Sequence, residues 1–217
     1  MKKIVVALSC ASGAAILLYL IGALRNQDFE YWYLTYNLGL AVIPLFLALW
    51  LRRLLKTRQW NEWRMLLLAL TWLLFLPNSF YIVTDFIHLP ETQRVDIVQD
   101  VVMLMQFSVV GLVLGFMSVY LLHKAYAKLL SARMLTLVVG MIFLLSSFAI
   151  YLGRELRWNS WDIVTQPWGL MRDVGDHLVN PGAHPEAFMM TFSFFIMLAS
   201  LYGLLWQLTK TLRRGKL

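Results

Sequence analysis

The sequence predicts an all-α membrane protein with six transmembrane helices, both termini cytoplasmic, and an extracytoplasmic amphipathic loop helix between the fifth and sixth spans. Three observations predict this class. Of the 217 residues, 60% are hydrophobic and only 14% are charged, whereas about a quarter of the residues in a soluble domain are charged. Six apolar runs each approach or exceed the roughly 20 residues that cross a bilayer. The basic residues concentrate in alternate connections between these runs.

The six runs are continuous, which is typical of helices and not of the alternating strands of a membrane barrel. They cover residues 4–24, 33–51, 65–88, 97–122, 134–152 and 187–208, and the outer loop covers residues 153–186. The first run follows Lys2 and Lys3 as in a signal peptide, but no Ala-x-Ala cleavage site precedes Arg25, so we expect a retained helix. We expect residues 1–217 to form a single six-helix membrane domain.

Several spans carry residues that shape helices. Pro44 in the second span and Pro77 in the third each remove a backbone hydrogen bond, and Asn78 can satisfy a backbone group that Pro77 frees. The fourth span carries the pair Gly111-x-x-x-Gly115, which permits close contact between helices. We interpret this pair as packing within the chain.

Lysine and arginine predict the orientation, because they are in excess on the cytoplasmic side. One set of span ends holds most of the basic residues, namely Lys2, Lys3, Arg52, Arg53, Lys56, Arg58, Arg64, Lys124, Lys128, Arg133, Lys210, Arg213, Arg214 and Lys216. The opposite set holds every acidic residue except Glu62. We therefore expect both termini in the cytoplasm and the acid-rich connections outside. The basic residues lie between apolar spans, so a nucleic-acid partner is excluded.

The outer loop contains a helical pattern. Apolar residues recur from Trp161 onward at near-helical spacing, with an interruption at Pro167; they are Val164, Trp168, Met171, Val174 and Leu178. This pattern predicts a helix that lies on the outer surface and can cover a cavity.

Polar groups from four spans are expected at one height near the outer boundary, among them Asn37, Asp85, Asp100 and Arg154. Asp85 and His88 are three residues apart and share one face of a helix. An ionised side chain at membrane depth costs about 2.5–3.5 kcal/mol on insertion scales, which makes such residues candidates for a functional site.

These side chains can support acid–base chemistry on a lipid headgroup or an envelope precursor. His88 can act as a general base that Asp85 orients, with Tyr81 or Thr84 as nucleophile or proton donor. Arginines bind phosphate or carboxylate in a bidentate manner. The candidate catalytic residues are His88, Asp85, Tyr81 and Thr84. The candidate substrate-binding residues are Arg154, Arg157, Asn78, Asn159, Asp162 and Trp158. A divalent metal is a further option, with Asp85, His88 and Asp100 as candidate ligands.

Two other classes stay open. In a structural accessory protein, Asp85 and Arg154 would form an ion pair that locks the third and fifth spans together. In a small-molecule transporter the site would lie near the midplane between broken helices, whereas the polar residues here are displaced outward. The sequence does not distinguish an enzyme from these alternatives.

Three stretches carry a resemblance to a known family, namely Asn37 to Leu45, Leu76 to Leu89, and Tyr151 to Asp162. In them the chain resembles the bacterial membrane family catalogued as domain of unknown function 1361, over nearly its whole length. The resemblance implies a small multi-spanning protein of the bacterial plasma (inner) membrane and supplies no reaction.

Overall fold

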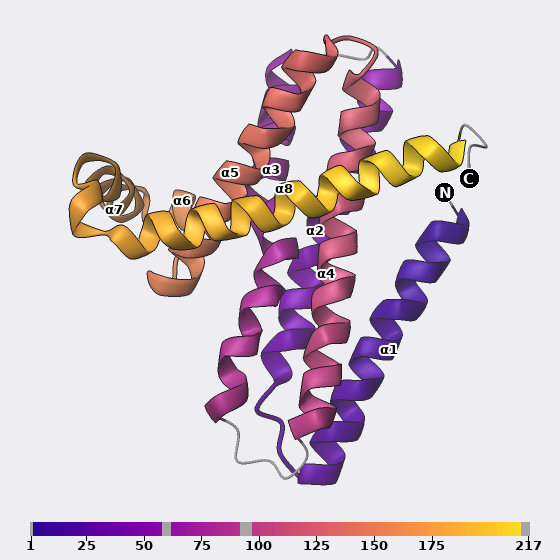
Figure 1. Ribbon diagram of the computed structural model, residues 1–217, viewed down its shortest axis with the longest axis vertical. Helices are drawn as coiled ribbons and strands as arrows, with labels where there is room; N and C mark the ends of the chain where they lie inside the picture. Colours follow the sequence, from indigo (N-terminus) through magenta and orange to yellow (C-terminus); the bar gives the residue numbers. More distant parts are fainter. Residues whose placement is uncertain (1, 58–61, 92–96, 214–217) are drawn as a thin grey trace. The chain divides into compact units, whose positions relative to one another are not determined.

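The computed structural model is built of helices, and six of them are long and apolar enough to cross a membrane (Figure 1). It describes residues 2–57, 62–91 and 97–213, and no strand occurs within these ranges. The six helices agree with the predicted all-α class and indicate a multi-pass membrane protein. The chain divides into two compact units, Met1–Leu122 and His123–Leu217, which we describe separately.

Unit 1 contains α1 (Lys2–Asn26), α2 (Trp32–Thr57), α3 (Glu62–Tyr81), the 3₁₀-helix η1 (Ile82–Glu91) and most of α4 (Ile97–Tyr126). Its core residues come from α1, α2, η1, α4 and the turn before α2, and include Ala15, Tyr19, Tyr31, Leu38, Ile82, Met103 and Phe107. Figure 1 shows that the end of α1, the start of α2, η1 and the start of α4 lie at the same end of this unit. That end collects the polar residues of the candidate site.

Hydrogen bonds from serine join α2, α3 and α4 around the proline of α2. The Ser79 hydroxyl donates to the Ala41 carbonyl at 2.8 Å. The Trp72 indole donates to the Ser118 hydroxyl at 2.6 Å, and Ser118 donates in turn to the Pro44 carbonyl at 3.0 Å. In a membrane, neighbouring serines commonly satisfy the backbone groups that a proline loosens. The stretch of α2 around Pro44 is therefore tied by hydrogen bonds to both α3 and α4.

The glycine pair of α4 packs against α3. A Cβ atom at Gly111 would lie 2.6 Å from the Ser79 carbonyl oxygen, and one at Gly115 would lie 2.4 Å from a ring carbon of Phe80. Any larger residue at these positions would separate the two helices. The geometry agrees with the interpretation of this pair as packing within the chain.

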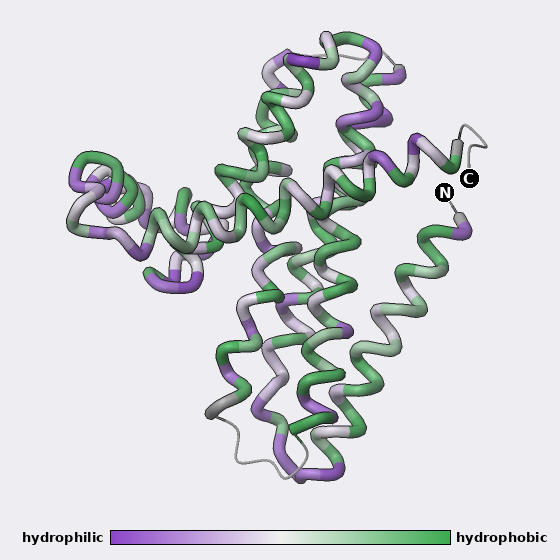
Figure 2. Tube along the Cα trace, viewed as in Figure 1, coloured by the Kyte–Doolittle hydropathy of each residue, from purple (hydrophilic) through white to green (hydrophobic). Residues whose placement is uncertain are grey.

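Unit 2 contains the end of α4, α5 (Ala132–Glu155), α6 (Asp162–Thr165), α7 (Pro167–Val179), the 3₁₀-helix η2 (Pro181–Ala183) and α8 (Pro185–Arg213). A small core joins α5, α7 and α8 through Tyr151, Leu152, Ala187, Leu170 and Val174. In Figure 2 the long helices are mostly hydrophobic, and hydrophilic residues gather towards their ends.

The helix bounds differ from the predicted ones in one informative way. The third span was predicted as one helix to His88, but its α-helix ends at Tyr81 and a 3₁₀-helix follows. Ile82, Val83 and Thr84 are β-branched, which disfavours continuing an α-helix. The loop helix is divided at Pro167, as predicted, because proline suits the first position of a new helix.

Some predictions reach beyond what the structure describes. Arg58, Arg214 and Lys216, which contribute to the orientation argument, lie outside the described residues. The orientation and the single domain of residues 1–217 stay predictions.

Candidate functional site

Two contacts between α2 and η1 form the centre of the candidate site. The Asn37 side-chain amide donates to the Asp85 carboxylate at 3.1 Å. The ring of Tyr33 meets the His88 ring edge-on, with 5.5 Å between the centroids. The start of α2 and η1 therefore run antiparallel and are in contact at two pairs of residues.

The 3₁₀ geometry makes this match possible. Asn37 follows Tyr33 by four residues on an α-helix, and His88 follows Asp85 by three residues on a 3₁₀-helix. With rises of about 1.5 and 2.0 Å per residue, both pairs are spaced by about 6 Å along their axes. An α-helical Asp85–His88 pair would span only about 4.5 Å. The change of helix type thus sets the register between the polar side chains of η1 and their partners on α2.

Burial distinguishes the two ionisable residues of η1. The Asp85 side chain is 1% exposed, and Asp100 of α4 in the same unit is equally buried. His88 is half-buried. A buried carboxylate is costly without hydrogen bonds, and Asn37 supplies one. Asp85 is thus a fixed group, whereas His88 lies nearer the surface of the unit.

Two other predicted residues of the third span bond to their own helix. The Thr84 hydroxyl donates to the Tyr81 carbonyl at 2.7 Å, and the Asn78 amide donates to the Phe75 carbonyl at 3.0 Å. The Asn78 amide thus bonds to Phe75, and not to the carbonyl of Leu73, which is the group that Pro77 frees. Tyr33 was missed as a candidate, although its spacing from Asn37 puts both on one face of α2.

In unit 2, Asp162 organises the turn that leads into α6. Its carboxylate accepts hydrogen bonds from the Asn159 backbone N–H at 2.7 Å, the Asn159 amide at 3.3 Å and the Thr165 hydroxyl at 2.9 Å. The Asn159 backbone bond, helped by those of the Thr165 and Asn159 side chains, lowers the pKa of Asp162 below its ordinary value. Asp162 and Asn159, both predicted to bind substrate, therefore hold the loop conformation.

Trp158 fixes the same loop to α7. Its indole N–H donates to the Asp173 carboxylate at 2.8 Å. Its ring lies against Gly169, where an added Cβ would be 2.9 Å from the indole. The ring thus covers one turn of α7, from Gly169 to Asp173.

The two candidate arginines lie around the end of α5. Arg154 is half-buried in its last turn. Arg157 is exposed and has a left-handed φ of 59°, and the next N–H, that of Trp158, returns to the Leu152 carbonyl at 3.1 Å. Arg157 thus occupies the turn that ends the helix. Because Arg154 and Asp85 belong to different units, a joint site stays a prediction.

The structure groups metal-ligating side chains in the loop before α8, and metal binding by Asp85, His88 and Asp100 stays a prediction. Within the described ranges, the group of three side chains whose ligand atoms lie within 4.8 Å of one another is Asp176, His177 and His184 in unit 2. Asp85, His88 and Asp100 form no such group there. Hydrogen bonds from Asn180 and then His184 lower the pKa of Asp176, so this carboxylate is ionised at neutral pH.

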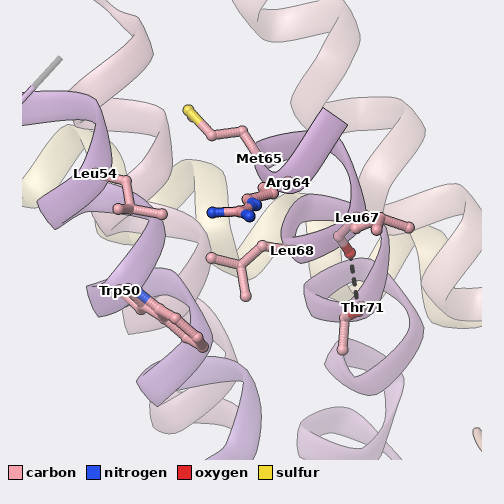
Figure 3. Close-up of a pocket in the computed structure, with 7 residues that line it drawn as sticks. All are labelled: Trp50, Leu54, Arg64, Met65, Leu67, Leu68 and Thr71. Atoms are coloured by element: carbon pink, nitrogen blue, oxygen red, sulfur yellow. Dashed lines mark hydrogen bonds between the residues drawn. The ribbon is translucent and has the colours of Figure 1, made fainter. Parts of the chain in front are cut away.

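A pocket of about 560 Å³ lies between α2 and α3, near the end of that helix pair remote from Asp85. It is lined by Trp50, Leu54, Arg64, Met65, Leu67, Leu68 and Thr71. In Figure 3 the Arg64 side chain extends from α3 towards Leu54 of α2. The Thr71 hydroxyl donates to the Leu67 carbonyl at 2.8 Å. One cation among apolar side chains suits an anionic headgroup with its acyl chain better than it suits acid–base chemistry.

Residues 36–201 match the family model described as "Protein of unknown function (DUF1361)". No match was found among the curated proteins or the solved structures.

Proposed function

The chain belongs to the DUF1361 family, and from that premise we propose that it is a membrane enzyme acting on the headgroup of a lipid or of a lipid-linked envelope precursor. The observation that carries this proposal is the pair of contacts between α2 and η1. A carboxylate that is 1% exposed and an imidazole that is half-buried lie three residues apart, on one face of a 3₁₀-helix. Ionisable residues within membrane segments are functional candidates by default.

The roles follow from exposure and bonding. His88 is the group that exchanges protons with the substrate, because it is the more accessible of the two. Asp85, held by Asn37, supplies a fixed negative charge beside it. The half-buried Tyr81 is the candidate nucleophile or proton donor, since the Thr84 hydroxyl already bonds to the backbone. Arg154 and Arg157 bind the anionic part of the headgroup.

The exposed face of α7 supports an interfacial location for this helix. Trp168 and Met171 are 78% and 64% exposed, and Leu178 is also exposed. An apolar face of this kind on a short helix suits the boundary between headgroups and acyl chains. In this proposal both termini are cytoplasmic, the membrane is the bacterial plasma membrane, and the partners are the bilayer and a lipid or lipid-linked substrate.

The test compares lipid profiles. Membranes containing equal amounts of the wild-type chain and of His88→Phe are extracted and their lipids are compared by mass spectrometry. His88→Phe keeps an aromatic ring against Tyr33 but cannot exchange protons. We expect the wild type to generate a headgroup species that the variant does not. Arg157→Gly should also lose that species, because it removes the guanidinium while glycine suits the left-handed φ.

The control is Gly140→Ala, where an added Cβ meets nothing within 4 Å. It should leave the lipid profile unchanged. Identical profiles in the wild type and His88→Phe would contradict the proposed enzyme.

The second candidate is a non-catalytic accessory protein. It is favoured by the hydrogen bonds that Thr84 and Asn78 make to their own helix, which are sufficient reason for those residues to be polar. In that case His88→Phe lowers the amount of folded protein and leaves no lipid difference once abundance is matched.

A further inference from the structure

A cluster of metal-ligating side chains lies where α7 ends and the chain turns into α8. Asp176 and His177 belong to the last turn of α7, and His184 follows η2. Their ligand atoms lie within 4.8 Å of one another. The cluster is separate from Asp85 and His88, and no residue in it was used in the proposed reaction.

His177 is held in the manner of a metal-binding histidine. Its Nδ1 lies 2.7 Å from the Asp173 carbonyl oxygen. Because a carbonyl oxygen only accepts hydrogen bonds, Nδ1 carries the proton and donates it. The other nitrogen, Nε2, therefore presents its lone pair, and the Tyr151 hydroxyl lies 3.0 Å from it. The side chain is 5% exposed, which fixes the ring. A backbone carbonyl on the second nitrogen is a common way in which proteins orient a metal ligand.

Asp176 and His184 face this ring from the surface side. The His184 and His177 rings stack with 3.8 Å between their centroids. His184 Nε2 lies 2.8 Å from one Asp176 oxygen, and the Asn180 amide donates to the other at 2.6 Å. The Asp176 carboxylate is thus already oriented by a second residue.

The donor set favours one class of ion. Two imidazoles and one carboxylate suit Zn²⁺ and related transition metals, whereas Mg²⁺ and Ca²⁺ prefer oxygen ligands throughout. Tetrahedral Zn²⁺ holds its ligand atoms about 3.3 Å apart, so the cluster must contract. The His184 ring must also turn out of its stack with His177, because the lone pairs of two parallel rings do not meet at one ion. Asp176 is exposed and His184 is partly exposed on a short connection, so both have room to move.

We propose that Asp176, His177 and His184 bind one Zn²⁺ ion, with water as the fourth ligand. The ion would tie the end of α7 to the start of α8 and would replace the hydrogen bond between His177 and Tyr151. Without metal, His184 Nε2 lies 2.8 Å from the Asp176 carboxylate and its Nδ1 lies 3.8 Å from the Glu186 carboxylate. The metal-bound and metal-free states differ in their content of metal, which can be measured directly.

The experiment uses the full chain, purified in detergent without a polyhistidine tag and stripped with EDTA. It is titrated with Zn²⁺ and, separately, with Co²⁺, whose visible absorption reports tetrahedral coordination. We expect one ion per chain. His184→Ala and Asp176→Asn, both at accessible positions, should each weaken binding at least about ten-fold.

Three variants serve as controls. Glu186→Gln, beside His184 but outside the ligand set, and His88→Phe in unit 1 should bind as the wild type does. Tyr151→Phe should bind at least as tightly, since it removes the competing hydrogen bond; weaker binding would overturn the three-ligand assignment. The proposal would be overturned if the wild-type chain shows no saturable binding of Zn²⁺ or Co²⁺, or if His184→Ala binds the ion as tightly as the wild type does. Because the readout is metal content, it stands or falls separately from the lipid comparison.

Discussion

A single carboxylate, that of Asp162, holds the turn between α5 and α6. We predict that Asp162→Asn lowers the free energy of unfolding by about 1 kcal/mol, because it weakens charge-assisted hydrogen bonds near the surface. Hydrogen exchange should be faster at the Asn159 amide, which donates to this carboxylate. Asp176→Asn, whose carboxylate bonds elsewhere in the loop, serves as the comparison. Unchanged protection of Asn159 would contradict this role.

The same carboxylate gives a pH dependence with a defined sign. The pKa of Asp162 is lower in the folded chain than its ordinary value of 3.8. Its contribution to stability is therefore complete above the unfolded pKa and is lost as the pH falls through the folded pKa. The difference in melting temperature between wild type and Asp162→Asn should be full at pH 6 and shrink below about pH 3.8. A difference that grows on acidification would have the wrong sign.

At the scale of elements, the contact between α3 and α4 depends on two glycines. We predict that Gly111→Ala lowers the free energy of unfolding by about 1–3 kcal/mol, because its Cβ would meet the immobile Ser79 carbonyl at 2.6 Å. The matched control is Gly39→Ala in α2, where a Cβ meets nothing within 4 Å. Thermal unfolding of both variants in detergent tests this contact. Equal melting temperatures would contradict the packing.

The pocket between α2 and α3 gives a prediction about lipid. We expect Arg64→Ala to reduce the amount of anionic phospholipid that copurifies with the chain, because Arg64 is the cation of the pocket lining. Thr71→Val keeps the shape of the lining and removes a hydroxyl that donates to the Leu67 carbonyl of its own helix, so it should retain the lipid. Quantitative lipid mass spectrometry measures both, and equal retention would argue against a lipid pocket.

Hydropathy was sufficient to predict the spans but not the change of helix type. Each predicted span lies within a helical segment, because about 20 apolar residues in a bilayer leave few alternatives. The change from α-helix to 3₁₀-helix at Ile82 depends on the register between η1 and α2. A count of apolar residues gives no information about that register. The Pro167 division was predictable because proline acts locally.

At the scale of the whole molecule, the orientation can be measured with cysteine labels. The chain has one cysteine, Cys10, which is replaced by serine first. We expect Gly182→Cys in the loop before α8 to react with a membrane-impermeant maleimide in intact cells, and Lys56→Cys at the basic end of α2 to react only after permeabilisation. Both positions are exposed in the structure. The reverse pattern would contradict cytoplasmic termini.

The candidate site could be predicted only in part, because its residues come from segments that lie far apart along the chain. Asp85, His88 and Asn37 could be selected because polar residues in apolar spans are conspicuous. Tyr33 is an ordinary interfacial aromatic until η1 brings His88 to it. Likewise His177 and His184 match no ligand motif in sequence, and only the turn at η2 stacks their rings.

The most direct test of the proposed centre is Asp85→Asn. An amide at this position can still accept the hydrogen bond from Asn37, so the packing of η1 on α2 is kept while the negative charge is removed. We predict wild-type abundance and melting temperature together with loss of the lipid species that the wild-type chain generates. A variant that folds normally and still generates that species would show that the carboxylate has no part in the chemistry.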